Sequence, residues 1–422
     1  MIKLLDKSNI SIFTYLYVFC FIAIYAGHAT VFARNLGDIR TVGNTFALIL
    51  TIVFVLVKKI SFKMDYFLVL GVFLLYAFIT AFAYKNLNWW WISVRFFFIT
   101  YAYVISKATC SHLITLFETI LYHLTIIALF FWVIMLVSPG LLDIIVHTFH
   151  FSEPLAEDGN VDANMIIYTL PNYEYGIHDF RLSFFRRNPG FMWEPGAFAS
   201  MLCVAIFCNI LRKKGLVLTN NSVLWVFLIA LFSTQSTTGF AVFFIMLFVL
   251  LFTTRKFGWA IIVIPLAVIL FTSLSFFGDK LLHEQEMLQY KDVMNTQGQQ
   301  GRFFSLVLDW QEFLRHPVLG LGCNWQDTWL AQNGFEISTV SGIGDLLSTY
   351  GAVIAVLFLC MTYKTCLVID REYDTKNGFL LIPVILGIMV SYAMWLYPIF
   401  IAIWMYGIWE PYSQRQGNIY CS

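Results

Sequence analysis

The chain has 422 residues, of which 59% are hydrophobic and only 12% are charged, and its mean hydropathy is +0.75. A soluble domain carries about 25% charged residues, because polar groups must cover the surface that meets water. A soluble enzyme is therefore excluded, and lipid must cover much of this protein. The net charge of +1 provides no global basic field for nucleic-acid binding, so any anion site must be local.

Apolar runs long enough to cross a membrane recur along the chain. About 20 apolar residues span the ~30 Å hydrocarbon core. Nine runs of about that size are Ser11–Ala33, Thr41–Val57, Tyr66–Tyr84, Trp89–Ser106, Leu113–Val137, Gly196–Leu211, Trp259–Phe277, Ile343–Tyr363 and Phe379–Trp395. The longer run Ser222–Thr253 has a polar break at Ser233–Gly239, which predicts two helices folded back on each other. With a last short stretch, Ile399–Trp409, we predict an all-α polytopic membrane protein of about 12 helices (11 to 13).

Most basic residues beside these spans fall on one side, which the positive-inside rule assigns to the cytoplasm together with both termini. They are Lys3, Lys7, Lys58, Lys59, Lys63, Lys107, Arg212, Lys213, Lys214, Arg255, Lys256, Lys364, Arg371, Lys376 and Arg415. Two long segments, Ser138–Pro195 and Gly278–Gly342, then lie outside, where loops of this length are usually functional. We predict a single membrane domain, residues 1–422, whose two outer loops contain short amphipathic helices.

Three arginines, Arg181, Arg186 and Arg187, precede the span that begins at Gly196. Arginine pairs bidentately with phosphate, and a helix N-terminus adds partial positive charge nearby. The pattern indicates a site for a diphosphate at the membrane surface. It is equally typical of a basic cluster that binds lipid head groups, with Glu194 and Pro195 as a plain helix-start signal.

In the second loop, Arg302 precedes an amphipathic stretch that includes Trp310 and Leu314 and ends at His316 and Pro317. This periodicity predicts a helix lying in the membrane plane. A cation at a helix start is opposed by the helix dipole, so Arg302 has a reason other than helix stability to stand there. The alternative for Arg302 is a solvated or head-group-bound charge.

Several ionisable residues fall within predicted spans, where desolvation costs about 3 kcal/mol or more unless they are paired. They are His28, Arg95, Glu118, His123 and Asp345. Arg95 lies about 9 Å below the outer boundary, either facing an anion site that opens outward or bonded to backbone carbonyls. Asp345 stands in a first helical turn, which favours a carboxylate in any case. The histidines are expected to form interhelical hydrogen bonds, and no metal-ligand spacing is present.

Short motifs in the second half of the chain follow a fixed order. They are Arg187, Gly190, Phe191, Glu194, Pro195 and Gly196 before a span, the break Ser233–Gly239, and Gly301 and Arg302 leading to Trp310, Pro317, Gly320 and Gly322. In this order they resemble the O-antigen polymerase and ligase superfamily of bacterial inner membranes. The resemblance covers roughly Asp179 to Ile354, and the earlier part of the chain matches only as generic spans.

The resemblance implies a GT-C-type membrane glycosyltransferase that uses a polyprenyl diphosphate-linked sugar donor at the outer face, without a cofactor. Family arginines that hold the donor diphosphate correspond to Arg187 and Arg302, and Arg186, Arg181 and Arg95 are further candidates. Ligases of the superfamily usually have a histidine eleven residues before the glycine that is Gly351 here. This chain has Val340 instead, which favours the polymerase branch, often called Wzy.

A sugar bonded to a diphosphate already has a good leaving group, so the protein must orient an acceptor hydroxyl and stabilise the departing phosphate. We expect a metal-independent, inverting reaction with Glu194, then His316, then Asp345 as candidate bases. The alternatives are a transporter or flippase of lipid-linked sugars, although the sequence lacks the repeated halves of such proteins, and a ligase. Expected partners are undecaprenyl diphosphate-linked oligosaccharides, membrane lipids, a chain-length regulator and a flippase, but no nucleic acid.

The orientation is testable with cysteines placed at Asn172 and Gln299, one in each long loop. Because the basic residues hold the opposite side in the cytoplasm, both cysteines should react with a membrane-impermeant maleimide in intact spheroplasts. A cysteine at Lys376 should react only after lysis. Protection of both loop positions until lysis would reverse the topology.

Overall fold

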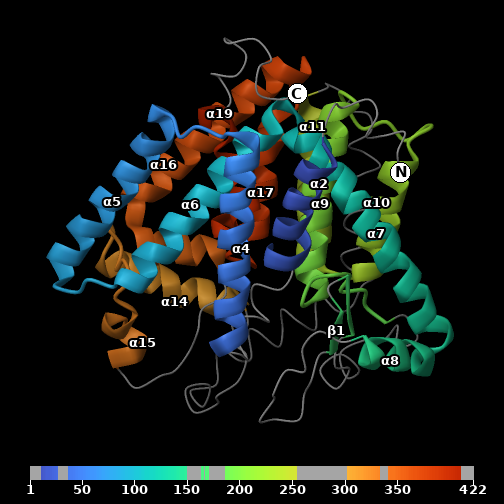
Figure 1. Ribbon diagram of the computed structural model, residues 1–422, viewed down its shortest axis with the longest axis horizontal. Helices are drawn as coiled ribbons and strands as arrows, with labels where there is room; N and C mark the ends of the chain where they lie inside the picture. The colour runs from blue at the N-terminus through green and yellow to red at the C-terminus, as the bar shows by residue number, and fades with distance from the viewer. Residues whose placement is uncertain are drawn as a thin grey trace.

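The computed structural model describes residues 11–26, 37–149, 163–165, 167–170, 186–253, 302–332 and 341–409. The predicted span Trp259–Phe277, as well as His28 and Arg181, lie outside these ranges. The described part is a bundle of helices with one small pair of strands (Figure 1). This confirms the predicted all-α class.

The principal helices follow the predicted apolar runs closely. They are α2 (Ile12–Phe19) with the π-helix η1 (Cys20–Ala26), α4 (Gly37–Lys58), α5 (Met64–Tyr84), α6 (Trp89–Thr109), α7 (Leu113–Val137) after the 3-10 turn η2 (Cys110–His112), α9 (Pro195–Arg212), α10 (Ser222–Thr234), α11 (Thr237–Thr253) and α16 (Gly342–Tyr373). The chain turns between α10 and α11 at the predicted polar break. Four described helical segments are long and apolar enough to cross a membrane: Met64–Tyr84, Trp89–Val137, Pro195–Arg212 and Gly342–Tyr373. The total of about 12 helices stays a prediction.

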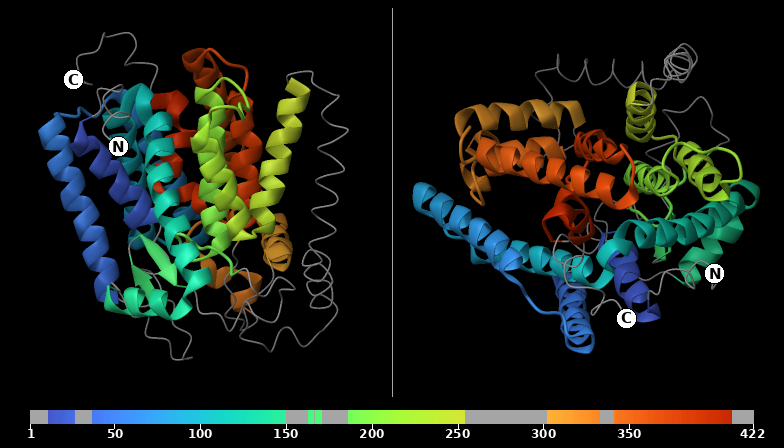
Figure 2. Two further views of the ribbon diagram at one scale, coloured as in Figure 1. Left: turned by 90° about the vertical axis from the view of Figure 1, so that its right-hand side faces the viewer. Right: turned by 90° about the horizontal axis from the view of Figure 1, so that it is seen from above.

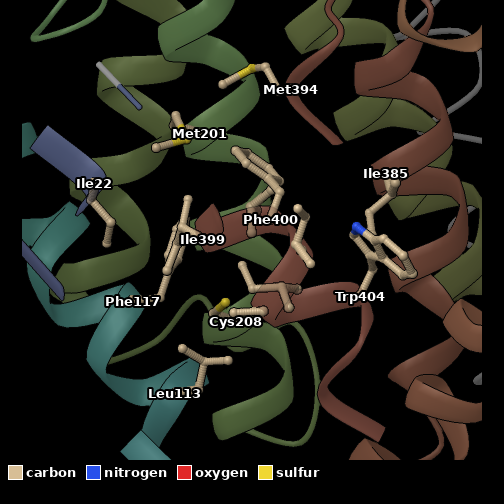
Figure 3. Close-up of a cluster of buried hydrophobic side chains, with 14 of the residues drawn as sticks. Ile22, Leu113, Phe117, Met201, Cys208, Ile385, Met394, Ile399, Phe400 and Trp404 are labelled. Carbon is tan, nitrogen blue, oxygen red and sulfur yellow. The ribbon is translucent and has the colours of Figure 1, made fainter. Parts of the chain in front are cut away.

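Helix α9 forms the centre of the bundle. In its apolar window 89% of the residues are buried, against 33% in each of the other three segments. Figure 3 shows side chains from η1, α7, α17 and α18 gathered around Met201 and Cys208 of this helix. A helix that is apolar on every face is buried by its neighbours, so α9 packs against protein all round while the others present a face to lipid.

Ionisable residues within the bundle are paired across helices. The Glu118 carboxylate of α7 accepts two hydrogen bonds from Arg212 and one from Asn209 of α9, each at 2.7 Å. His123 Nδ1 and the Tyr15 hydroxyl lie 2.9 Å apart, which confirms the expected interhelical role for that histidine. A bidentate Arg–carboxylate pair is among the strongest polar contacts available, and here it fixes α7 to α9 at the end of the bundle where α9 finishes.

The last apolar stretches form a hairpin of short helices. Its elements are η6 (Gly378–Leu380), α17 (Leu381–Met389), η7 (Met394–Leu396), α18 (Pro398–Trp404) and α19 (Tyr406–Trp409). The Gly378 amide donates to Asp370 at 2.7 Å, and Thr365 bonds to the Trp404 carbonyl and the Gly407 amide at 2.8 and 2.9 Å. The hairpin therefore begins and ends beside the same part of α16. The nine residues of α17 rise only about 14 Å, so the predicted Phe379–Trp395 span is a shorter helix than expected.

Helix α16 is broken at Gly351, whose φ of +70° and ψ of 179° are not helical. The loop that follows α14 (Arg302–Arg315) lies along the break. Leu321 and Gly322 donate to the carbonyls of Ser348 and Thr349, both at 2.8 Å, and Ala352 donates to Pro317 at 2.8 Å. This short backbone ladder replaces the helical hydrogen bonds that the break removes.

A tyrosine from α5 braces the same ladder. The Tyr76 hydroxyl lies 2.8 Å from the Leu319 carbonyl and 2.9 Å from the Thr349 carbonyl. Because a hydroxyl has a single proton, it donates to either carbonyl in turn. Helices α5 and α16 and the loop after α14 are thereby held together at one point.

The described parts of the two long segments lie at the same end of the bundle (Figures 1 and 2). The first contains α8 (Pro139–Thr148) and an antiparallel hairpin of β1 (Ala163–Met165) and β2 (Tyr168–Leu170), in which Asn164 pairs with Thr169. The second contains α14, η5 (Trp325–Asp327) and α15 (Trp329–Gln332). The hairpin was not expected, because strands of three residues leave no periodic signal.

Helix α14 lies across the bundle, as the view from above shows (Figure 2). Trp310 and Leu314 on it are 48% and 60% exposed, whereas Asp309 and Glu312 are only 5% and 7% exposed. The apolar face therefore points away from the protein and the acidic face points into it. This arrangement fits a helix that lies in the membrane plane, the role that its sequence predicts.

Gly351→Ala should destabilise the protein by about 2 kcal/mol or more, because the left-handed φ is unfavourable for alanine and the added Cβ would overlap the loop backbone, 2.5 Å from Gly320 N. The matched control is Gly71→Ala in α5, where nothing lies within 4 Å of the added carbon. There we expect no loss, or a gain of about 0.5–1 kcal/mol. Melting temperatures in detergent measure both changes, and equal melting temperatures would show that the break tolerates a side chain.

Candidate functional site

The segment before α9 is held by a buried asparagine. Asn188 is fully buried; its side chain donates to Ser233 Oγ at 2.9 Å and accepts from the Gly190 amide at 3.0 Å, while its own amide donates to the Ser233 carbonyl at 2.9 Å. Gly190 has a φ of +59°, and a Cβ there would lie 2.8 Å from the Phe198 ring. The turn into α9 thus has one tightly defined geometry, which depends on the end of α10.

This turn positions the first of the predicted arginines. Arg187 Nε donates to the Thr234 carbonyl at 3.1 Å, at the C-terminal end of α10, where the helix dipole favours a cation. The Arg186 carbonyl accepts a hydrogen bond from Trp132 Nε1 at 2.7 Å. Both arginine side chains are half-buried. The two residues are therefore anchored between α7 and α10, at the end of the bundle that carries α8 and α14.

Three helices start beside the tip of the α17–α18 hairpin, Val390–Tyr397. Trp193, just before α9, packs edge-on against Tyr392 with ring centroids 6.3 Å apart. Thr238 in the first turn of α11 lies 2.6 Å from Ser391 through their hydroxyls. A side chain at Gly342, the first residue of α16, would overlap the Tyr392 carbonyl. We call the tip and these three helix starts the junction; its three helix dipoles all place partial positive charge there.

Four polar residues gather within the junction: Arg95 from α6, Asp345 and Tyr350 from α16, and Trp395 from the tip. Arg95 interacts electrostatically with Asp345 and with Tyr350, and the Trp395 indole approaches the Asp345 carboxyl. The Asp345 Oδ1 atom accepts from Thr349 at 3.1 Å. We call these four residues the buried polar cluster. Arg95 thus lies beside a carboxylate.

The remaining candidates are spread more widely. Glu194 is the residue before α9, half-buried, and its carboxylate does not cap the helix. Arg302 begins α14 as expected, whereas His316 follows the other end, 3.3 Å from the Tyr84 hydroxyl. The contacts of His316 are with Tyr84 of α5 and with the loop after α14, whereas Arg187, Glu194, Arg95 and Asp345 lie in the junction or beside it.

Sequence reasoning missed three residues of this region: Asp309, Tyr350 and Trp395. Asp309 of α14 lies against Gly344 in the first turn of α16, where a carboxylate complements the dipole. Its spacing with Ser305 and Glu312, opposite Trp310, could have indicated a buried polar face. No comparable signal marks Tyr350 or Trp395, because aromatic residues in apolar runs are ordinary core residues.

Comparison of the chain with protein-family models, with curated proteins and with solved structures finds no match. Among the residues that the structure describes, no group of three or more His, Cys, Asp or Glu side chains is arranged to hold a metal ion.

Asn188→Ala should lower the stability of the protein by about 2–3 kcal/mol, because it leaves the buried Gly190 amide without its partner and removes the hydrogen bond that Ser233 Oγ accepts. The Arg187 turn would lose its geometry at the same time. An exposed amide on α14, Gln311, supplies the control, and Gln311→Ala should change the melting temperature by less than a degree or so. An Asn188→Ala protein as stable as the control would show that the turn does not depend on this side chain.

Proposed function

We propose that this protein is a glycosyltransferase of the bacterial inner membrane that joins polyprenyl diphosphate-linked oligosaccharide repeat units at the outer face. The product is a polysaccharide of the O-antigen or capsule type. The observation that carries the proposal is the anchoring of Arg186 and Arg187 beside the junction. Cations and three helix starts are concentrated there, at the end of the bundle that also carries α8 and α14.

A diphosphate carries two or more negative charges, and its recognition requires several donors from different elements. Arg187 is held by the end of α10, and Arg302 begins α14, which packs on α16 through Asp309 and Gly344. The first turn of α16 already has the Asp309 carboxylate against it, so that helix start is unsuited to a second anion. The start of α9 and the α10–α11 turn, next to Arg187, are the better place for the diphosphate.

The depth of the site suits a lipid-linked substrate. Exposed apolar side chains on α14, such as Trp310 and Leu314, would contact lipid beside the junction. A polyprenyl tail can then remain in the membrane while its diphosphate reaches the arginines at the surface. Stabilisation of the negative charge that develops on the departing diphosphate is the main catalytic requirement of this transfer.

A transporter of lipid-linked sugars is the second candidate, and one observation favours it. The broken α16 and the short α17–α18 hairpin are discontinuous helices, a feature that transporters use to form substrate sites within the membrane. A transporter moves its substrate between two compartments and makes no covalent change. Purified protein in detergent micelles separates the two functions, because only a polymerase can form product where no second compartment exists.

The joint variant Arg187→Ala/Arg302→Ala should lower polymerisation of purified lipid-linked repeat units at least 100-fold, because two charge-assisted phosphate contacts are lost. Lysine at both positions should restore only part of the rate, since an ammonium cannot form the bidentate fork. Product length on a gel of the micellar reaction measures the effect.

Arg371→Ala is the matched control, because Arg371 is an exposed arginine in the last turn of α16, at the opposite end of the bundle. It should polymerise at the wild-type rate. A correctly inserted double-alanine protein with wild-type activity would contradict the assignment of the diphosphate site. Absence of polymer with the wild-type protein itself, together with uptake of lipid-linked sugar into vesicles, would favour the transporter.

A further inference from the structure

The buried polar cluster contains four polar atoms that lack regular hydrogen bonds. They are Arg95 Nε, Asp345 Oδ2, Tyr350 Oη and Trp395 Nε1. Each is inaccessible to solvent and without a hydrogen bond of normal geometry to any described residue, although the Trp395 indole lies near the Asp345 carboxyl and the Arg95 guanidinium lies near the Tyr350 hydroxyl. Tyr350 and Trp395 are only 4% exposed. More than nine in ten buried polar groups in folded proteins have a partner, so four such atoms at one place require an explanation.

These atoms come from three separate elements and face one another. Asp345 and Tyr350 belong to the half of α16 before its break, Arg95 to α6, and Trp395 to the hairpin tip. Aromatic rings surround them: Tyr350 lies 5.8 Å from Trp91 and 5.3 Å from Trp395, measured between ring centroids. Polar groups that converge from separate elements among aromatic rings can orient a polar ligand.

A ligand that completes this set must both accept and donate hydrogen bonds. Arg95 and Trp395 can only donate, Tyr350 can do either, and an ionised Asp345 can only accept. A sugar hydroxyl has this dual character, whereas a diphosphate offers only acceptors and would be repelled by the carboxylate.

We propose that the buried polar cluster binds the acceptor sugar of the transfer reaction and that Asp345 is the general base. This inference rests on the proposed function. Asp345 is favoured over Glu194, which stands half-exposed at the helix start, and over His316, whose ring contacts Tyr84 of α5 and no member of the cluster that the described contacts name. Arg95 is a positioning residue: its charge lies opposite the carboxylate and favours the ionised form.

The reaction balances with these groups alone. The acceptor hydroxyl oxygen forms a new bond to the anomeric carbon of the donor sugar, on the face opposite the diphosphate. The bond from that carbon to the diphosphate oxygen breaks, and its electron pair leaves with the polyprenyl diphosphate. The hydroxyl proton passes to the Asp345 carboxylate, which later releases it to water. Neither an oxidant nor a reductant is required.

The broken helix gives this assignment a structural basis. An intact α16 would form its own hydrogen bonds through Tyr350 and Gly351, whereas the break lets the half-helix Gly342–Tyr350 follow the loop after α14. Asp345 and Tyr350 are five residues apart in that half-helix. The half-helix begins beside the hairpin tip, which carries Trp395. Arg95 lies six residues after the start of α6 at Trp89, so the proton acceptor opposite it lies nearly two turns below that helix end, away from bulk water.

The test compares Asp345→Asn with wild type in the micellar assay, using lipid-linked repeat units extracted from cells that lack the gene. Because a general base contributes about 10²–10⁴ in rate, turnover should fall at least 100-fold. Binding of undecaprenyl diphosphate, which probes the donor site alone, should stay within about twofold. Asp374→Asn is the matched control: this exposed carboxylate bonds to Lys214 at 2.8 Å at the other end of α16, and its removal should leave turnover unchanged.

Two further variants decide the matter if Asp345→Asn does not insert. Asp345→Glu keeps the base and should retain measurable turnover, and Tyr350→Phe removes one hydroxyl and should slow transfer about tenfold at subsaturating acceptor. If Asp345→Asn turns over at the wild-type rate, the inference is overturned and the polymerase assignment stays intact. If Asp345→Asn cannot be recovered, wild-type turnover in Tyr350→Phe has the same consequence. Absence of polymer with wild type would instead overturn the proposed function.

Discussion

Backbone hydrogen bonding in a medium without water is the constraint on which this structure depends. A peptide group without a partner in the hydrocarbon core costs several kcal/mol, so irregular backbone persists at that depth only where protein surrounds it. The break of α16 at Gly351 meets this condition through the ladder with Pro317–Gly322 and the bracing hydroxyl of Tyr76. The hairpin tip meets it among the starts of α9, α11 and α16.

The need to surround irregular backbone with protein also bears on the central position of α9. A short hairpin leaves an uneven surface, and a regular helix buried on all sides packs against α17 of that hairpin as well as against α7, α10 and α11. The Glu118–Arg212 pair fixes one end of α9 to α7, and the Asn188 turn fixes the other end to α10. Elements attached to α9 at both ends can hold the junction in one geometry, as a site for chemistry requires.

The sequence predicts the regular elements well and the irregular ones poorly. Hydropathy and a polar break identify the α10–α11 pair, and periodicity places the start of α14 at Arg302, because both signals are local. The break at Gly351 has no such signal, since a glycine within an apolar run is common in membrane helices. The α17–α18 hairpin was expected as longer helices because length alone does not show where a chain turns back.

The candidate site was predictable in part for the same reason. Arg186, Arg187 and Arg302 were predicted as candidates because arginine is rare in this chain and these three stand next to predicted spans or helix starts. Trp395 and Tyr350 were not, because their relation to Arg95 and Asp345 depends on contacts between residues that are far apart in the sequence. The partner of Glu118 also depends on how α7 and α9 pack together: it is Arg212, at the end of α9.

Separation of charge within the junction follows from electrostatics. Two like charges 4 Å apart repel by about 4 kcal/mol at an effective dielectric constant of 20, so a carboxylate base directly beside a diphosphate would oppose its binding. Arg95 against Asp345 offsets that repulsion, and the arginines beside the α10–α11 turn lie on a different element from the carboxylate. Unlike Asp345, Glu194 shares the turn into α9 with Arg187, where its own charge would compete with the diphosphate for the same cation. Under the proposed function, this charge distribution would set a donor side, with arginines at the surface, apart from an acceptor side, where Arg95 neutralises the carboxylate.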